Sequence, residues 1–63
     1  MVCKIKETRE KLGMSQKELA KKSGISRYLI SKLENGEDVN ITKRTMVLLS
    51  NALNKSVSEI FLF

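Results

Sequence analysis

The segment of residues 15–36, SQKELAKKSGISRYLISKLENG, constrains the fold of this chain more than any other part of it. Ser15 and Glu18 have the S-x-x-E spacing of a capping box, which predicts that a helix begins just after Ser15. Gly24 follows nine residues after Ser15, in a position where a helix commonly ends in the left-handed conformation. A second amphipathic stretch comes next and ends at Gly36. The segment therefore predicts two short helices joined by a tight turn.

The second of these helices, expected over about residues 26–35, has two different faces when successive residues are placed about 100° apart. Leu29, Ile30 and Leu33 fall within one arc of about 100°, which predicts a face that packs against the core. The opposite arc, of about 140°, holds side chains that can all donate hydrogen bonds. They are Arg27, Tyr28, Ser31, Lys32 and Asn35. Such a face is either simply solvated or free to contact the bases and phosphates of a nucleic acid.

Helical periodicity recurs along the rest of the chain, whereas no alternating apolar pattern predicts a strand. A first helix is expected over about residues 4–12 and a fourth over about residues 43–53, capped by Thr42. Ser56 and Glu59 form a second capping box, which predicts a short fifth helix that includes Phe61. The sequence therefore predicts an all-α protein with five short helices around one small core.

The length of the chain, 63 residues, predicts a single domain over residues 1–63. A domain of this size buries only about 60% of the surface of its unfolded chain, so its stability is marginal without a disulfide, a metal or a partner. Cys3 is the single cysteine, and no Cys/His cluster could bind zinc, so neither a disulfide nor a metal is expected. Self-association is left as the open route to further stability.

Several classes of function are disfavoured by what the sequence lacks. No apolar run approaches the ~18 residues that span a bilayer, and no signal peptide is evident. With a single cysteine as well, a reduced, cytoplasmic location is expected. Without histidine there is no Ser-His or Cys-His nucleophile pair, and an enzyme is not expected. No cofactor or small-molecule effector is implied either. Twelve Lys and Arg against seven Asp and Glu give a net charge of +5, which favours a polyanionic partner.

Glu34 lies at the border between the polar and apolar arcs of the second helix of the pair. A lone carboxylate at this position would be costly to bury, so a partner is expected. Arg9 is the candidate because it falls on the inward side of the first helix. Two independent surface charges are equally compatible with the spacing alone.

Short motifs with fixed spacing run along nearly the whole chain. They are GMSQ at 13–16, ELA at 18–20, GISR at 24–27, ISKLENG at 30–36 and SVSEIF at 56–61. In this combination the chain resembles the DNA-binding domain of phage repressors and Cro proteins, the Xre family of bacterial regulators. The resemblance implies a five-helix, lambda-repressor-like fold with a helix-turn-helix at about residues 15–35. It also implies sequence-specific binding to double-stranded DNA.

The resemblance assigns the reading of bases to the second helix of the helix-turn-helix. Arg27, Tyr28 and Lys32 match the main base-reading positions of the family. Ser26 and Ser31 match neighbouring positions that contact a phosphate or a base. The expected binding is direct readout in the major groove, with Arg27 as the candidate for a bidentate contact to guanine.

Other matching positions are implied to support this helix or to bind phosphate. Gln16 matches a glutamine that opens the first helix of the pair, binds a phosphate and braces the recognition helix. Asn35 matches a position just past the recognition helix that approaches a phosphate. Arg9 and Glu34 match a partly buried ion pair, which is interpreted as structural.

Three further basic residues, Lys17, Lys43 and Arg44, are expected to act electrostatically and to set affinity and salt sensitivity rather than sequence choice. Lys43 departs from the family pattern, in which an apolar residue usually begins the fourth helix, and Ile41 is expected to take that place in the core. Leu29 also stands at a position that is often polar. It either touches a thymine methyl or a sugar, or it extends the core, which is the preferred interpretation.

A homodimer on a palindromic operator is expected, because one such domain makes too few base contacts for good specificity in a genome. The two half-sites would lie ~34 Å apart. Apolar residues that one small core does not cover are the candidates for the dimer surface. They are Leu48, Phe61, Leu62 and Phe63, although Phe61 can instead pack on its own core.

The expected function is that of a small bacterial or phage transcriptional regulator, and more narrowly a repressor. Two alternatives within DNA binding are a controller of a restriction–modification operon and an antitoxin-like autoregulator. An alternative of a different class is an adaptor that has kept the same fold and contacts protein or RNA.

Overall fold

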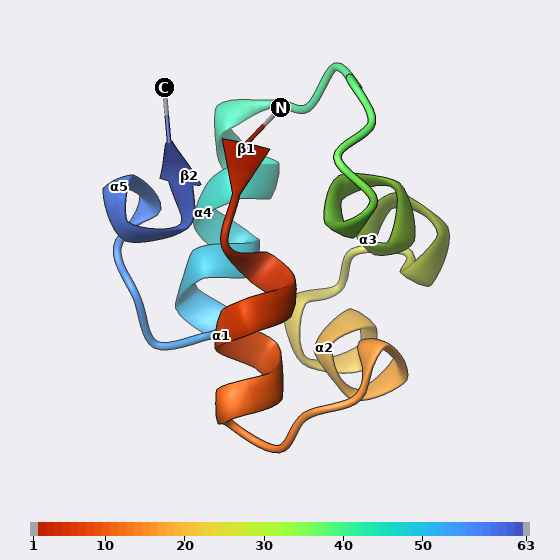
Figure 1. The fold of residues 1–63 in the computed structure, drawn as a ribbon, viewed down its shortest axis with the longest axis vertical. Coiled ribbons are helices and arrows are strands. Elements are labelled where there is room, and N and C mark those ends of the chain that lie inside the picture. The colour runs from red at the N-terminus through yellow and green to blue at the C-terminus, as the bar shows by residue number, and fades with distance from the viewer. Residues whose placement is uncertain (1, 63) are drawn as a thin grey trace.

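The computed structural model describes residues 2–62, which form five short helices and one two-residue strand near each end of the chain (Figure 1). The elements are β1 (Val2–Cys3), α1 (Ile5–Lys11), α2 (Gln16–Ser23), α3 (Arg27–Glu34), α4 (Lys43–Ala52), α5 (Val57–Ile60) and β2 (Phe61–Leu62). Helix α2 packs against α3 and α4, and α5 packs against α4. The prediction of a five-helix, lambda-repressor-like fold is confirmed.

The helix-turn-helix begins and ends where its capping residues predict. The Ser15 hydroxyl accepts a hydrogen bond from the Glu18 N–H at 3.0 Å, and the Glu18 carboxylate accepts one from the Ser15 N–H at 2.9 Å. Gly24 ends α2 with a φ of 77°, in the left-handed region. Ser26 then caps α3 by accepting a hydrogen bond from the Leu29 N–H at 3.2 Å. These local bonds satisfy backbone donors that a helix start leaves open, so they set the short turn between α2 and α3.

The hydrophobic core receives side chains from all five helices and from β2. Its members are Ile5, Leu19, Ile30, Leu33, Leu49, Ala52, Leu53, Ile60 and Phe61. Each of them is at most 5% exposed, and burial of one large aliphatic side chain contributes about 1.5–3 kcal/mol to folding. Leu29 and Ile41 are partly buried and pack against this core. Both were expected to extend it, and both expectations are confirmed.

The antiparallel pair of β1 and β2 is the element that the sequence did not predict. Cys3 lies opposite Phe61 in the register of the pair, and the Lys4 N–H donates a hydrogen bond to the Ile60 carbonyl at 2.7 Å. The pair joins the beginning of the described chain to its end (Figure 1). Two residues per strand are too few for an alternating pattern to be recognised, which explains why the expectation of no strand was wrong.

The same strand corrects one of the residues assigned to a dimer surface. Helix α5 ends at Ile60, and Phe61 is extended, with its side chain in the core at 1% exposure. Successive side chains of a strand point to opposite faces, so Leu62 turns outward and is 43% exposed. Phe61 is therefore inaccessible to a second copy, whereas Leu62 remains accessible. Leu48 is half-buried on α4, and Phe63 lies outside the described residues.

We expect the substitution Phe61→Ala to lower the free energy of unfolding by about 3–5 kcal/mol, because it removes a buried ring and leaves a cavity. That loss approaches the whole stability of a domain of this size, about 3–9 kcal/mol. Leu62→Ala, in the same strand, is the matched control and should cost less than about 1 kcal/mol because its side chain is partly exposed. Urea denaturation followed by circular dichroism measures both losses. Equal losses would show that Phe61 is not a core residue.

Candidate nucleic-acid interface

Helix α3 has one face in the core and one face toward solvent. Ile30 and Leu33 are at most 1% exposed, whereas Tyr28 on the opposite side is 71% exposed. The polar residues on this solvent side of α3 and at its C-cap are all exposed or half-buried. They are Arg27, Tyr28, Ser31, Lys32 and Asn35. The structure thus gathers guanidinium, phenol, hydroxyl, ammonium and amide donors along one exposed helix.

Part of this polar face is organised by contacts around Lys32. Its ammonium nitrogen lies 4.9 Å from the centroid of the Tyr28 ring and 3.9 Å from Oε1 of Glu37. The interaction with the Tyr28 side chain and, to a smaller extent, the attraction to Glu37 raise the pKa of Lys32 above its ordinary value. Lys32 is therefore positively charged throughout the neutral range. Glu37 was not singled out from the sequence, although Gly36 before it signals that the chain turns back at this point.

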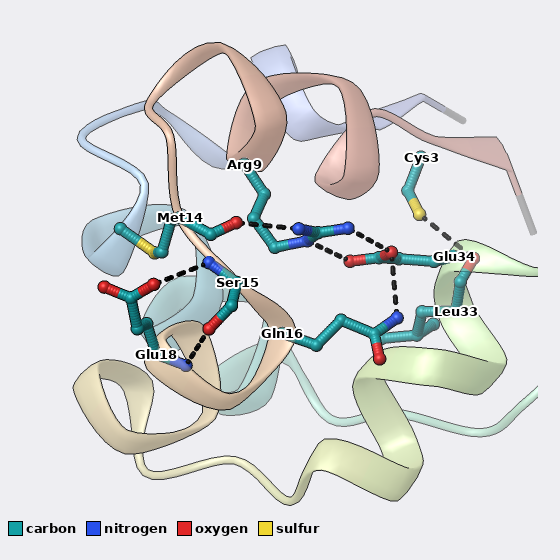
Figure 2. Close-up of polar contacts among 8 residues, drawn as sticks. All are labelled: Cys3, Arg9, Met14, Ser15, Gln16, Glu18, Leu33 and Glu34. Carbon is teal, nitrogen blue, oxygen red and sulfur yellow. Dashed lines mark hydrogen bonds and ion pairs between the residues drawn. The ribbon is translucent and has the colours of Figure 1, made fainter.

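The inner side of α3 is tied to two other helices through Glu34 (Figure 2). Its carboxylate accepts hydrogen bonds from Arg9 Nε at 2.8 Å, from Arg9 Nη2 at 3.0 Å and from Gln16 Nε2 at 3.0 Å. The third guanidinium nitrogen of Arg9, Nη1, donates to the Met14 carbonyl at 2.7 Å. The expected Arg9–Glu34 ion pair is therefore present, and Gln16 braces α3 through the same carboxylate. One carboxylate, only 3% exposed, joins α1, α2 and α3.

The surroundings of Glu34 lower its pKa below the ordinary value for a glutamate. Burial by itself raises this pKa, but hydrogen bonds from Arg9 and Gln16, together with the positive charges of Arg9 and Lys6, outweigh it. The hydrogen bond to Glu34 correspondingly raises the pKa of Arg9. Both groups are charged at neutral pH, and their hydrogen-bonding atoms face each other. The pair is thus engaged in holding α3 rather than in contacting a ligand.

The other basic and polar candidates lie at the beginnings of helices. Lys17 is exposed in the first turn of α2, beside Gln16, and Ser26 is exposed at the cap of α3. Lys43 and Arg44 are exposed at the start of α4, after the loop of residues 37–42 that leads away from α3 (Figure 1). The structure connects Gln16 to α3 through Glu34. The phosphate contacts of Lys17, Lys43 and Arg44 stay predictions.

Residues 2–62 contain neither a candidate metal site nor a candidate membrane-spanning helix. No group of three or more cysteine and acidic side chains in this part of the chain could hold a metal ion. No helix within these described residues is both long enough and apolar enough to cross a bilayer. The candidate features for binding are the polar face of α3 and the exposed basic residues in the first turns of α2 and α4.

We expect Glu34 to make the stability of the protein depend on pH in the acid range. Its folded pKa is lower than its unfolded value of about 4.3, so its contribution is complete above that pH and is lost as the pH falls through the folded pKa. Glu34→Gln should remove this contribution to the decrease of stability at acid pH. At pH 7 it should lower the free energy of unfolding by about 3 kcal/mol, because it leaves Arg9 poorly paired.

Urea denaturation from neutral to acid pH measures this difference. Glu7→Gln, an exposed carboxylate on α1, is the matched control and should stay within about 0.5 kcal/mol of the wild type at pH 7. Identical pH profiles of wild type and Glu34→Gln would contradict the assignment.

Comparison with known proteins agrees with this geometry. Residues 5–60 match a family model described as helix-turn-helix. Two similar proteins of the archaeon Archaeoglobus fulgidus, each named an uncharacterized HTH-type transcriptional regulator, are 38% and 36% identical to the chain over 63 residues. These alignments cover 100% of the chain and 89% and 87% of the two relatives. No solved structure matches the chain. The chain therefore belongs to the Xre-type helix-turn-helix family of transcriptional regulators.

Proposed function

We propose that this protein is a repressor that binds a palindromic operator as a homodimer, with α3 of each copy in the major groove. The observation that carries the proposal is the two-sided nature of α3. Its apolar side is locked in the core, Glu34 ties it to α1 and α2, and its polar side is free. A rigid helix that presents hydrogen-bond donors is what readout of base edges in the major groove requires. The site of action is accordingly the nucleoid, in the cytoplasm.

Arg27, Tyr28 and Lys32 are the proposed base readers of α3. Arg27 begins the helix, is exposed, and has a planar fork that matches the O6 and N7 acceptors of guanine. Tyr28 offers an apolar ring and a hydroxyl. Ser26, Ser31 and Asn35 lie beside them and are proposed to contact phosphates or base edges.

Gln16, Lys17, Lys43 and Arg44 are proposed to contact the DNA backbone. Such contacts fix the register of the protein on the duplex and supply affinity that depends on salt. The net charge of +5 supports this assignment, because a basic domain is attracted to a polyanion before any base is read. The Gln16 carboxamide uses its nitrogen on Glu34, so its oxygen is directed elsewhere and a phosphate contact requires the second amide proton.

The proposed dimer surface centres on Leu62, with Leu48 as a second candidate. Leu62 lines an open groove between α1, α5 and β2, and Leu12, which is 49% exposed, lines the same groove. The wall also carries charges of both signs, among them Lys4, Lys11, Lys55, Glu7 and Glu59. A second copy related by a two-fold axis brings the same residues to the surface, so unlike charges can pair around the leucines. A second copy of the chain is therefore the proposed occupant.

Selection of bound sequences from a pool of random duplexes tests the proposed function. We expect the selected sequences to share a palindrome whose half-sites lie ~34 Å apart. The logarithm of the affinity should fall linearly with the logarithm of the salt concentration. Failure to bind any duplex at low salt would refute the proposal, and an adaptor that contacts protein or RNA would then be the better interpretation.

We expect Arg27→Ala and Lys17→Ala to affect binding in different ways. Arg27→Ala should relax the choice of base at one position of each half-site. The binding free energy that discriminates between bases at this position should fall by about 1–3 kcal/mol. Lys17→Ala should weaken binding to all sequences alike. It should also make the plot of the logarithm of the affinity against the logarithm of the salt concentration less steep by about 1. Competition between single-base variants of the selected duplex measures both effects. The reverse pattern would mean that the two roles are assigned wrongly.

We expect Leu62→Glu to weaken binding to the palindrome while leaving binding to a single half-site unchanged, because it places a charge in the proposed dimer surface. Lys22→Gln, at an exposed position near the end of α2, lowers the net charge by one unit as Leu62→Glu does and is the control for the change in charge. Anisotropy measurements with full and half operators, together with sedimentation of the free protein, separate the two effects. Equal weakening on both duplexes would exclude Leu62 from the dimer surface.

A further inference from the structure

We propose that Glu37 is a positioning residue for base recognition. Together with the ring of Tyr28, the Glu37 carboxylate holds the ammonium group of Lys32 on the exposed face of α3. In this position the ammonium group contacts a base instead of a phosphate. The inference rests on the proposed function, because it concerns the same helix face. It adds an acidic residue from the loop after α3 to a surface whose other proposed contacts come from basic and neutral side chains.

A lysine needs such help more than an arginine does. Its ammonium group is a compact charge on a flexible stem, and it has no planar fork that could define its own orientation. Near a duplex, a freely moving ammonium group is drawn to the phosphates, which carry no sequence information. Lys32 can contribute to specificity only if something in the protein restrains it.

The structure places two restraining neighbours beside the Lys32 ammonium group. Tyr28 lies four residues earlier on the same helix face, and its ring centroid is 4.9 Å from the nitrogen. Oε1 of Glu37 is 3.9 Å from the same nitrogen. The Lys32 side chain is still 33% exposed. Since an ammonium group has three donors, it can keep these neighbours and still donate to a base.

The backbone at the end of α3 places Glu37 beside Lys32. Gly36 has a φ of 77°, its N–H donates to the Leu33 carbonyl at 3.2 Å, and the Glu37 N–H donates to the Lys32 carbonyl at 3.1 Å. These two bonds form a Schellman motif, in which a left-handed glycine turns the chain back over the last helical turn. Nothing lies within 4 Å of the position that a Gly36 Cβ would occupy, so the conformation and not the space requires glycine. The main chain of Glu37 is therefore bonded directly to the residue whose side chain it restrains.

Glu37→Gln keeps the size of the side chain and removes its charge, so it releases Lys32 on that side. We expect binding to a duplex of scrambled sequence to tighten about two- to fivefold, the range of an exposed ion pair. The plot of the logarithm of the affinity against the logarithm of the salt concentration should become steeper by about 0.9, because Lys32 then neutralises a phosphate. Discrimination should fall about two- to fivefold at one base position only, namely the position that Lys32→Met also relaxes.

The experiment compares wild type, Glu37→Gln, Lys32→Met and the double variant by fluorescence anisotropy. The probes are the duplex selected from the random pool, its single-base variants and a scrambled duplex, each over a range of salt. Glu10→Gln is the matched control, because it removes one exposed carboxylate from α1 and should leave the discrimination at every base unchanged. In the Lys32→Met background, Glu37→Gln should have no further effect on discrimination. Circular dichroism verifies that each variant is folded.

Three results would overturn the inference in distinguishable ways. If Glu37→Gln and Glu10→Gln tighten all sequences alike, Glu37 acts only through net charge. If the loss of discrimination persists without Lys32, Glu37 acts on another residue. If the wild type selects an operator but Glu37→Gln discriminates as well as the wild type, only the positioning role fails. Wild-type protein that binds no duplex would instead refute the proposed function itself.

Discussion

The carboxylate of Glu34 is the interaction on which the arrangement of the helix-turn-helix depends. A carboxylate that is almost fully buried is stable only when charge and hydrogen bonds compensate the loss of water. Here Arg9 supplies two donors from α1 and Gln16 supplies one from α2. These directional bonds define the rotation of α3 about its own axis, which the non-directional packing of Ile30 and Leu33 leaves less strictly determined. They therefore hold α3 in one rotation, with its polar side chains facing outward.

The two ends of α3 serve the structure and the proposed function together. Ser26 begins the helix by capping it, so that the exposed Arg27 stands in its first turn. Gly36 ends the helix, and the turn that it makes brings Glu37 next to Lys32. Local backbone bonds thus set both the length of the recognition helix and the surroundings of its polar side chains. The same short segment would be a marginal helix by itself, because eight residues are too few without tertiary packing.

Features that depend on neighbours within one helical turn could be predicted from the sequence. The capping box of Ser15 and Glu18, the left-handed Gly24 and the two faces of α3 all have this origin. The short strands could not be predicted in the same way, because each is only two residues long and its partner lies at the other end of the chain. The burial of Phe61 follows from that pairing. The apolar C-terminal run was visible in the sequence, but not the direction in which each of its side chains points.

The sequence by itself determined the limits of the helix-turn-helix and which residues of α3 are polar, since hydrogen bonds over three or four residues and a period of about 3.6 residues decide both. Only the tertiary structure decided that Arg9 pairs with Glu34 and that Phe61 belongs to the core. The spacing of Arg9 and Glu34 allowed two separate surface charges equally well. Which charges meet depends on how whole helices pack, and that packing is set by the burial of apolar surface from distant parts of the chain.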